Sequence, residues 1–105
     1  MRAGRLRQRV TIQEKVVTRN AYGEEVITWA DVATVWGSVE PLRGDEFLEF
    51  ARAGAEVSTR IVLRYRSGIV PEMRVSYDGH TYDVLSVINV EERDKELQLM
   101  CRELV

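Results

Sequence analysis

Residue types that support metal binding or nucleophilic catalysis are scarce in this sequence of 105 residues. It contains one histidine, His80, and one cysteine, Cys101. A tetrahedral zinc site of cysteine and histidine ligands is therefore excluded, and so is an intrachain disulfide. His80 follows an Asp-Gly turn, where a histidine is usually just solvated. Cys101 ends an alternating apolar run, in which we expect it to pack as a small buried hydrophobe.

Paired carboxylates are the next candidates for chemistry. Asp45 and Glu49 are four residues apart, so a helix would place them on one face, and paired acids can serve acid–base or metal chemistry. Here they alternate with Phe47, Leu48 and Phe50 on a short segment, which favours a solvated helix face. There is no serine in a Gly-x-Ser-x-Gly turn and no glycine-rich phosphate loop. We expect no enzyme activity, no catalytic residue, no metal site and no cofactor.

Arginines could instead mark a nucleic-acid surface. Arg60, Arg64 and Arg66 fall on one face of a predicted strand, whereas Tyr65 falls on the other, which leaves charge without an aromatic stacking surface. The formal net charge of −2 is also not typical of a general nucleic-acid binder. An acidic protein neighbour or plain solvation is the favoured interpretation.

Two-residue alternation of apolar side chains dominates the sequence and predicts strands. These strands cover residues 9–17, 26–29, 33–39, 57–66, 74–77, 82–90 and 97–101. The first two should form a hairpin around the turn at 19–23, and Pro41 should end the third. Short turns between successive strands favour antiparallel pairing. We predict one mainly β domain over residues 1–105: a small antiparallel barrel or sandwich of six to seven strands.

Two segments depart from the strand pattern. Residues 42–56 form a long loop with a short helix over 43–54, because acids near its start and Gly54 at its end suit helix termini. Its apolar residues fall on both faces, which predicts two contact surfaces. Residues 1–8 are rich in arginine and are expected to form a flexible basic arm. No signal peptide and no membrane-spanning apolar run is evident, so we expect a soluble protein made in a cytoplasm.

Several of these segments, in this order, match a known family. The matching stretches are Gly4–Gln13, Val35–Gly44, Arg64–Ile69, Pro71–Val75 and Glu96–Glu103. With Tyr22-Gly23 and Trp29 between the first two, they run almost end to end. The chain resembles the head–tail joining proteins of tailed bacteriophages, also called head-closure or head–tail adaptor proteins.

The resemblance implies a β-barrel subunit that assembles as a ring, often of twelve copies, beneath the portal or its adaptor. The implied partners are other copies of the chain, the portal or adaptor ring, tail proteins and the packaged DNA in the channel, with no membrane. The implied location is the head–tail interface of the virion, with assembly in the host cytoplasm. In some relatives a long loop projects into the channel and helps to retain DNA, and the matching segment here is 42–56.

Two sets of candidate contact residues follow. The candidate channel or neighbour-contact loop contains Arg43, Asp45, Glu46, Phe47, Glu49, Phe50 and Arg52. The candidate docking arm contains Arg2, Arg5, Arg7 and Arg9. A ring of acids from the loop would repel DNA and let it slide, since DNA is held by cations. Two alternatives stay open: a tail-completion or tail-terminator subunit, and a small-barrel module that binds nucleic acid or a peptide.

Overall fold

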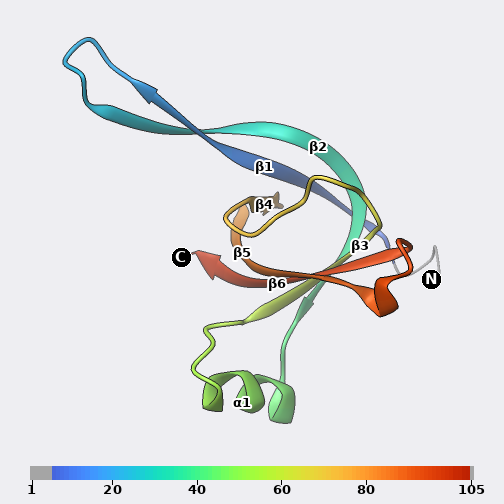
Figure 1. Ribbon diagram of the computed structural model, residues 1–105. Helices are drawn as coiled ribbons and strands as arrows, with labels where there is room; N and C mark the ends of the chain where they lie inside the picture. Colours follow the sequence, from blue (N-terminus) through green and yellow to red (C-terminus); the bar gives the residue numbers. More distant parts are fainter. Residues whose placement is uncertain (1–5, 105) are drawn as a thin grey trace.

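The computed structural model of the chain describes residues 6–104. Over these residues the elements run in the order β1 (Gln8–Arg19), β2 (Glu25–Pro41), α1 (Gly44–Arg52), β3 (Thr59–Arg64), β4 (Arg74–Tyr77), β5 (His80–Asn89), the 3-10 turn η2 (Val90–Glu92) and β6 (Glu96–Leu104) (Figure 1). The strands close into a barrel in the order β1-β2-β3-β6-β5-β4, and each pairs with its neighbours in antiparallel fashion. Closure leaves fewer unpaired edges to protect. The predicted small antiparallel barrel is confirmed.

The barrel interior is filled by the alternate apolar residues that defined the predicted strands. The buried cluster contains Val10, Ile12, Ile61, Leu63, Ile69, Met73, Val75, Tyr82, Val84, Leu97, Leu99 and Cys101. Gly37 lets β2 approach β3 closely: a Cβ there would lie 2.9 Å from Leu63 Cδ2 and 3.1 Å from the carbonyl oxygen of Val62. The close approach, and not an unusual φ, is what requires glycine at this position.

The predicted strands at 26–29 and 33–39 are in fact one long strand, β2. The pairing of Ile12 with Ala33 is followed by that of Gln13 with Asp31, so Val32 is an extra residue in a bulge. Asp31 suits a strand poorly, but Gln13 Nε2 donates a hydrogen bond of 2.8 Å to its carboxylate. The bulge and this bond let the strand continue where the sequence pattern breaks.

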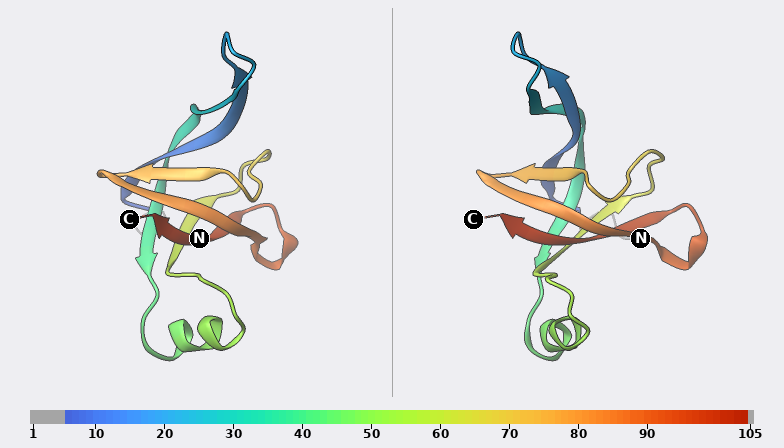
Figure 2. Two further views of the ribbon diagram at one scale, coloured as in Figure 1. Left: turned by 90° about the vertical axis from the view of Figure 1, so that its left-hand side faces the viewer. Right: turned by 60° about the vertical axis from the view of Figure 1, so that its left-hand side comes forward.

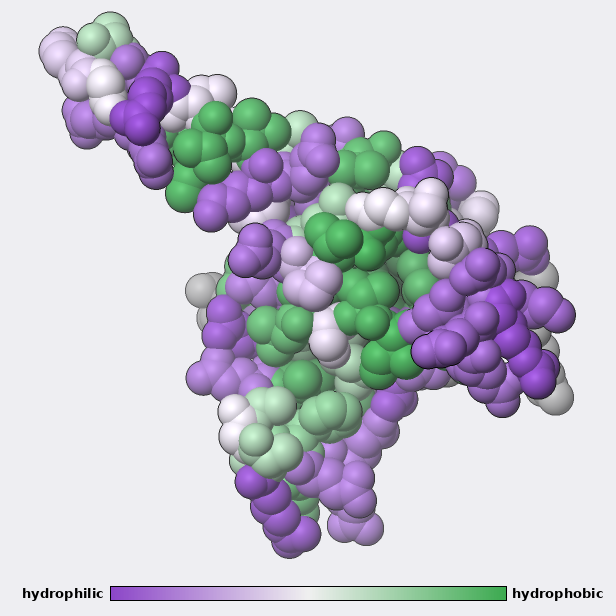
Figure 3. Space-filling model, in the orientation of Figure 1, coloured by the Kyte–Doolittle hydropathy of each residue, from purple (hydrophilic) through white to green (hydrophobic). Residues whose placement is uncertain are grey.

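The first hairpin extends well beyond the barrel. We call residues 14–30 the hairpin arm, and Figures 1 and 2 show it projecting from one side while α1 lies on the opposite side. In the described chain, β1 pairs with β4 only over Thr11–Gln13 and β2 pairs with β3 only from Gly37 onward. Midway along the arm, exposed apolar side chains such as Val17 and Ile27 form a hydrophobic stretch (Figure 3). The arm therefore contributes little to the barrel core.

The strand predicted over 57–66 is shorter than expected and is solvated on only part of its outer face. It covers Thr59–Arg64, so Tyr65 lies beyond its end. Val62 points away from the interior yet is fully buried, and Arg60 on the same side is half-buried and ion-paired. The expected basic, solvated face therefore exists only at Arg64 and Arg66, which are exposed, while Val62 is buried and Arg60 pairs with Glu46 of the helix. Among the described residues, no helix has the length and apolar character to cross a bilayer.

Candidate assembly surfaces

The segment predicted as a long loop with a short helix, residues 42–56, forms a compact excursion that we call the α1 loop. Its helix begins after the extended residue Arg43, and Asp45 and Glu46 lie in the first turn, where acids suit the helix dipole. At its end the Gly54 N–H donates to the Ala51 carbonyl and Gly54 has φ +79°, which suits glycine. The helix ends at Arg52, within the predicted range.

One side of the α1 loop packs on the barrel. Phe50 and Ala55 contact a second small cluster of buried residues, made of Leu42, Val57 and Met100. Met100 belongs to β6 and points outward, because its neighbours Leu99 and Cys101 are in the interior cluster. A helix this short would not persist alone in water. Burial of Phe50 is therefore what holds it in place.

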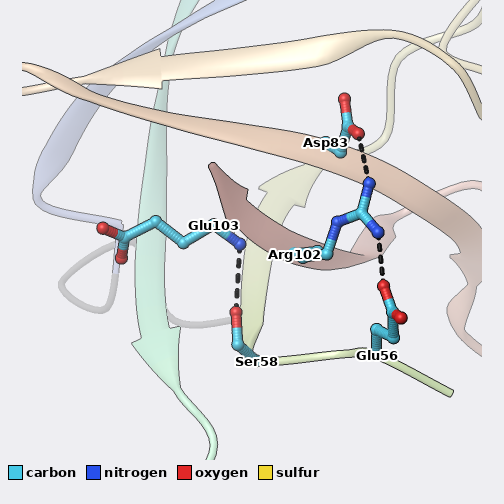
Figure 4. A network of polar contacts seen from close by, with 5 residues as sticks. All are labelled: Glu56, Ser58, Asp83, Arg102 and Glu103. Atoms are coloured by element: carbon cyan, nitrogen blue, oxygen red, sulfur yellow. Dashed lines mark hydrogen bonds and ion pairs between the residues drawn. The ribbon is translucent and has the colours of Figure 1, made fainter. Parts of the chain in front are cut away.

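Ion pairs also tie the α1 loop to the barrel. Arg60 of β3 pairs with Glu46 on the helix and lies 4.0 Å from Glu40 of β2. Arg102 of β6 pairs with Glu56 at the end of the loop and with Asp83 of β5 at 3.0 Å, as Figure 4 shows. Hydrogen bonds to Glu56 and Asp83 raise the pKa of Arg102 above its ordinary value, so the Arg102 side chain stays charged in these ion pairs.

A serine completes the base of the loop. Ser58 Oγ accepts a hydrogen bond of 3.0 Å from the Glu103 N–H (Figure 4), and the Ser58 carbonyl accepts one of 2.9 Å from the Leu42 N–H. Contacts at both ends and in the middle thus hold the α1 loop in one position on the barrel. It is a preformed projection.

The remaining candidate residues of the α1 loop face solvent. Phe47 is 45% exposed, and Arg43, Asp45, Glu49 and Arg52 are exposed as well. The structure thus separates the two phenylalanines, with Phe50 against the barrel and Phe47 outward. Glu46 is half-buried and neutralised by Arg60. The outward carboxylates of this helix are therefore those of Asp45 and Glu49.

The candidate docking arm is only partly described. Arg2 and Arg5 lie outside the described residues. Arg7 is exposed just before β1, and Arg9 is part of β1, where its guanidinium lies 5.0 Å from the centre of the Trp36 ring. Leu6 is buried. The structure thus places the last of the four arginines in the barrel wall, stacked on an aromatic ring.

Arg7 and Arg9 line an open groove of about 870 Å³. We call it the basic groove; its lining residues are Leu6, Arg7, Arg9, Thr34, Val35, Trp36, Arg64, Tyr65 and Arg66. It lies where β2 diverges from the end of β3. Tyr65 was expected on the face opposite the arginines. Because β3 ends at Arg64, side chains no longer alternate there, and Tyr65 lines the groove together with Arg64 and Arg66. The Tyr65 N–H donates to the Lys95 carbonyl. The expectation of charge without an aromatic surface was wrong.

A smaller hollow of about 450 Å³ lies at the base of the hairpin arm. The guanidinium of Arg74 lies 4.3 Å from the centre of the Trp29 ring, and its Nε donates a hydrogen bond of 2.7 Å to Gln13 Oε1. These contacts join β4 to Gln13 of β1, just before the arm begins, and to Trp29 of β2 within the arm. They fix the direction in which the arm leaves the barrel.

The two residues with intrinsically reactive side chains have no role in these surfaces. His80 is exposed, with Nδ1 3.1 Å from Glu103 Oε2. Cys101 is fully buried in the barrel interior. Burial, reinforced by the charge of Asp83, raises the pKa of the Cys101 thiol to about 12. Cys101 therefore stays protonated and packs as a small hydrophobe.

We expect Cys101 to resist iodoacetamide in the native protein at pH 8 and to react once the protein is unfolded in urea. Because its pKa is higher in the folded than in the unfolded chain, its contribution to stability is complete below about pH 9 and is lost as the pH rises toward about 12. Mass spectrometry and urea titrations at increasing pH measure both effects. Rapid native alkylation would contradict the burial.

The described residues thus form a closed barrel with a preformed helical loop on one side, a long hairpin on the other and a basic groove. A sequence-family profile for the phage head completion protein matches residues 1–104. The chain belongs to the phage head completion protein family and is a structural component of phage particles.

Two solved structures share this fold. The solution structure of protein SF1141 from Shigella flexneri 2a has 32% sequence identity, covers 98% of this chain and 96% of its own, and gives a TM-score of 0.75. A chain in the virion of a native gene transfer agent particle has 23% identity, covers 96% of this chain and 97% of its own, and gives a TM-score of 0.67. No curated protein matches the chain.

Proposed function

We propose that the protein is a non-enzymatic subunit of a head–tail connector: a ring that lies below the portal or its adaptor, joins head to tail and helps to retain packaged DNA. One observation carries this proposal within the family. The barrel bears a long projection, the hairpin arm, and a separate open hollow, the basic groove, which are two different surfaces. A subunit of a closed ring contacts its two neighbours through two different surfaces.

Ring formation is tested by mixing the purified protein with the portal or adaptor ring of the same phage. We expect electron microscopy to show an added ring below the adaptor, with a copy number equal to the symmetry of that template, often twelve. Native mass spectrometry counts the copies. Attachment to isolated tail tubes, with no attachment to the adaptor, would instead support the tail-completion alternative.

The role of the α1 loop in DNA retention rests on its outward carboxylates. If Asp45 and Glu49 face the channel, they repel DNA, and lysines in their place should bind its phosphates. We expect the D45K/E49K variant to lower infectivity by about tenfold, because the added cations bind the DNA phosphates. Titre and the fraction of particles that keep a nuclease-protected genome measure this effect.

A charge change elsewhere provides the control. Glu92 is exposed on the turn between β5 and β6, so Glu92→Lys changes the net charge without touching the α1 loop. It should leave titre and genome retention near those of the wild type. Equal effects of the D45K/E49K variant and of Glu92→Lys would show that the α1 loop does not face the channel.

The N-terminal arginines are proposed to dock on acidic grooves of the adjoining ring through charge-assisted hydrogen bonds. Deletion of residues 1–5 tests this while leaving Leu6 and β1 intact. We expect weaker attachment to the adaptor, with a shallower dependence on salt than the wild type shows, because fewer charged contacts remain to be screened. Unchanged attachment of the shortened chain would show that Arg2 and Arg5 have no docking role.

A further inference from the structure

The basic groove combines charge with exposed aromatic surface. Four of its nine lining residues are arginines, and its two aromatic residues, Trp36 and Tyr65, are 52% and 40% exposed. Leu6 and Val35 give it an apolar floor. Such a groove suits a ligand that offers both a ring and a carboxylate, because aromatic and arginine side chains dominate binding energy at protein interfaces.

The tip of the hairpin arm offers both groups. Tyr22 is 87% exposed and Glu24 lies two residues further on, also exposed. We call residues 20–24 the arm tip. Nearby Glu25 is paired with Arg19 at 3.7 Å, so its charge is already countered.

The arm tip is held rigid by its own hydrogen bonds. Asn20 Oδ1 accepts bonds of 2.9 Å from the Tyr22 N–H and 3.0 Å from the Glu24 N–H. The Asn20 N–H donates to the Glu24 carbonyl, and Arg19 Nη1 donates to the Gly23 carbonyl at 2.9 Å. Tyr22 is therefore presented on an ordered turn, which lowers the entropy lost when it binds.

The arm tip of one molecule cannot reach its own basic groove. From Glu25 to Trp36 the chain is continuous strand, which spans roughly 35 Å at about 3.3 Å per residue. The tip and the groove are thus two separate, complementary surfaces at opposite ends of one ribbon. A contact between them must join two copies, and a head-to-tail contact of this kind generates rings.

We propose that the arm tip of each subunit seats in the basic groove of the next, with the Tyr22 ring against Trp36 and Tyr65 and the Glu24 carboxylate among the arginines. This deepens the proposed ring function and rests on it: it names which surfaces join the copies. The occupant of the groove is a second copy of this chain, chosen because the tip matches the groove in both charge and aromatic character.

Cysteine cross-linking between different variants tests the contact directly. One batch carries Ala21→Cys, next to Tyr22 on the arm tip, and another Thr34→Cys in the groove lining, so the aromatic residues of the contact stay native. Native Cys101 is buried and does not compete. The two are mixed on the adaptor ring and oxidised. A covalent dimer is expected in the mixture and not in either batch alone, because a disulfide requires Cα atoms within about 7 Å. Rings that assemble without this dimer would overturn the contact and leave the ring function standing.

Single substitutions in otherwise native protein provide the second readout. Tyr22→Ala and Glu24→Arg should each lower occupancy of the ring by about tenfold or more, as expected for an interface anchor. Glu14→Arg is the matched control, since Glu14 is an exposed acid on the same arm away from its tip. Normal ring occupancy in both tip variants would also overturn the proposal.

Failures of the contact and of the ring can be told apart. If the wild-type protein forms no ring on the adaptor, both the proposed function and the proposed contact between the arm tip and the basic groove are wrong. If the ring forms and the groove instead binds single-stranded DNA oligonucleotides, with binding lost in Arg64→Glu and unchanged in Tyr22→Ala, the groove belongs to nucleic acid. In that case the contact between copies is wrong although the ring remains.

Discussion

Replacing Ile61 by alanine is expected to lower the free energy of unfolding by about 2–5 kcal/mol, which is a large share of the stability of a small domain. Ile61 is fully buried in β3, between Val39 of β2 and Leu99 of β6 in the strand register. Truncation removes buried apolar surface and leaves a cavity in the middle of the barrel. Urea denaturation followed by circular dichroism measures the loss.

Ile27→Ala is the matched control, because the same residue type lies on the hairpin arm and is 52% exposed. We expect it to cost less than about 1 kcal/mol, as is usual for surface substitutions. Comparing the losses in free energy of unfolding shows that packing in the barrel stabilises the fold and that packing on the arm contributes little. Similar losses in the two variants would show that the arm is part of the cooperative core.

Replacing Phe50 by alanine is expected to release the α1 loop from the barrel. Phe50 is its apolar anchor on Leu42, Val57 and Met100, and a nine-residue helix without an anchor is unstable in water. Phe50 is partly buried, so the loss of roughly 1–1.5 kcal/mol of burial should speed local opening by about fivefold to tenfold. Hydrogen exchange of the amides in residues 44–55 measures this opening.

Phe47→Ala is the control on the same helix, because Phe47 faces solvent. It should leave hydrogen exchange of the loop unchanged in the isolated protein. If Phe47 contacts a neighbouring subunit, its truncation should weaken assembly while leaving the monomer intact. Equal hydrogen exchange in the Phe50 and Phe47 variants would mean that the ion pairs of Arg60 and Arg102, and not the phenylalanine, hold the loop.

Much of the barrel could be predicted from local patterns in the sequence. Alternation of apolar residues marks the strands, because successive side chains in a strand point to opposite faces. Asp78-Gly79 marks the tight turn between β4 and β5, and both residues have positive φ there. The helix over Gly44–Arg52 followed from its acids, its apolar spacing and Gly54. Counting one histidine and one cysteine in the sequence excludes a tetrahedral zinc site made of these two residue types.

Only the tertiary structure determined which residues lie next to one another on the surface of the protein. The stacking of Arg9 on Trp36 depends on pairing between β1 and β2, and the arrival of Tyr65 beside Arg64 and Arg66 depends on where β3 ends. Alternation predicts that neighbouring residues face apart only while the strand continues. Likewise, Val62 is on the outer face of β3 and is nevertheless fully buried. The two-residue alternation of a strand predicts which face a side chain is on, but not whether another part of the chain covers that face.

The sequence by itself thus determined the class of fold, because strand periodicity and turn chemistry are local properties, and the order of its segments carried the resemblance to the family. The hairpin arm, the basic groove and the ion pairs of the α1 loop came from strand register and closure of the barrel. Those depend on contacts between residues far apart in the chain, such as Arg60 with Glu40 and Arg102 with Glu56. Local patterns carry no information on such pairs, since packing of the whole chain selects them.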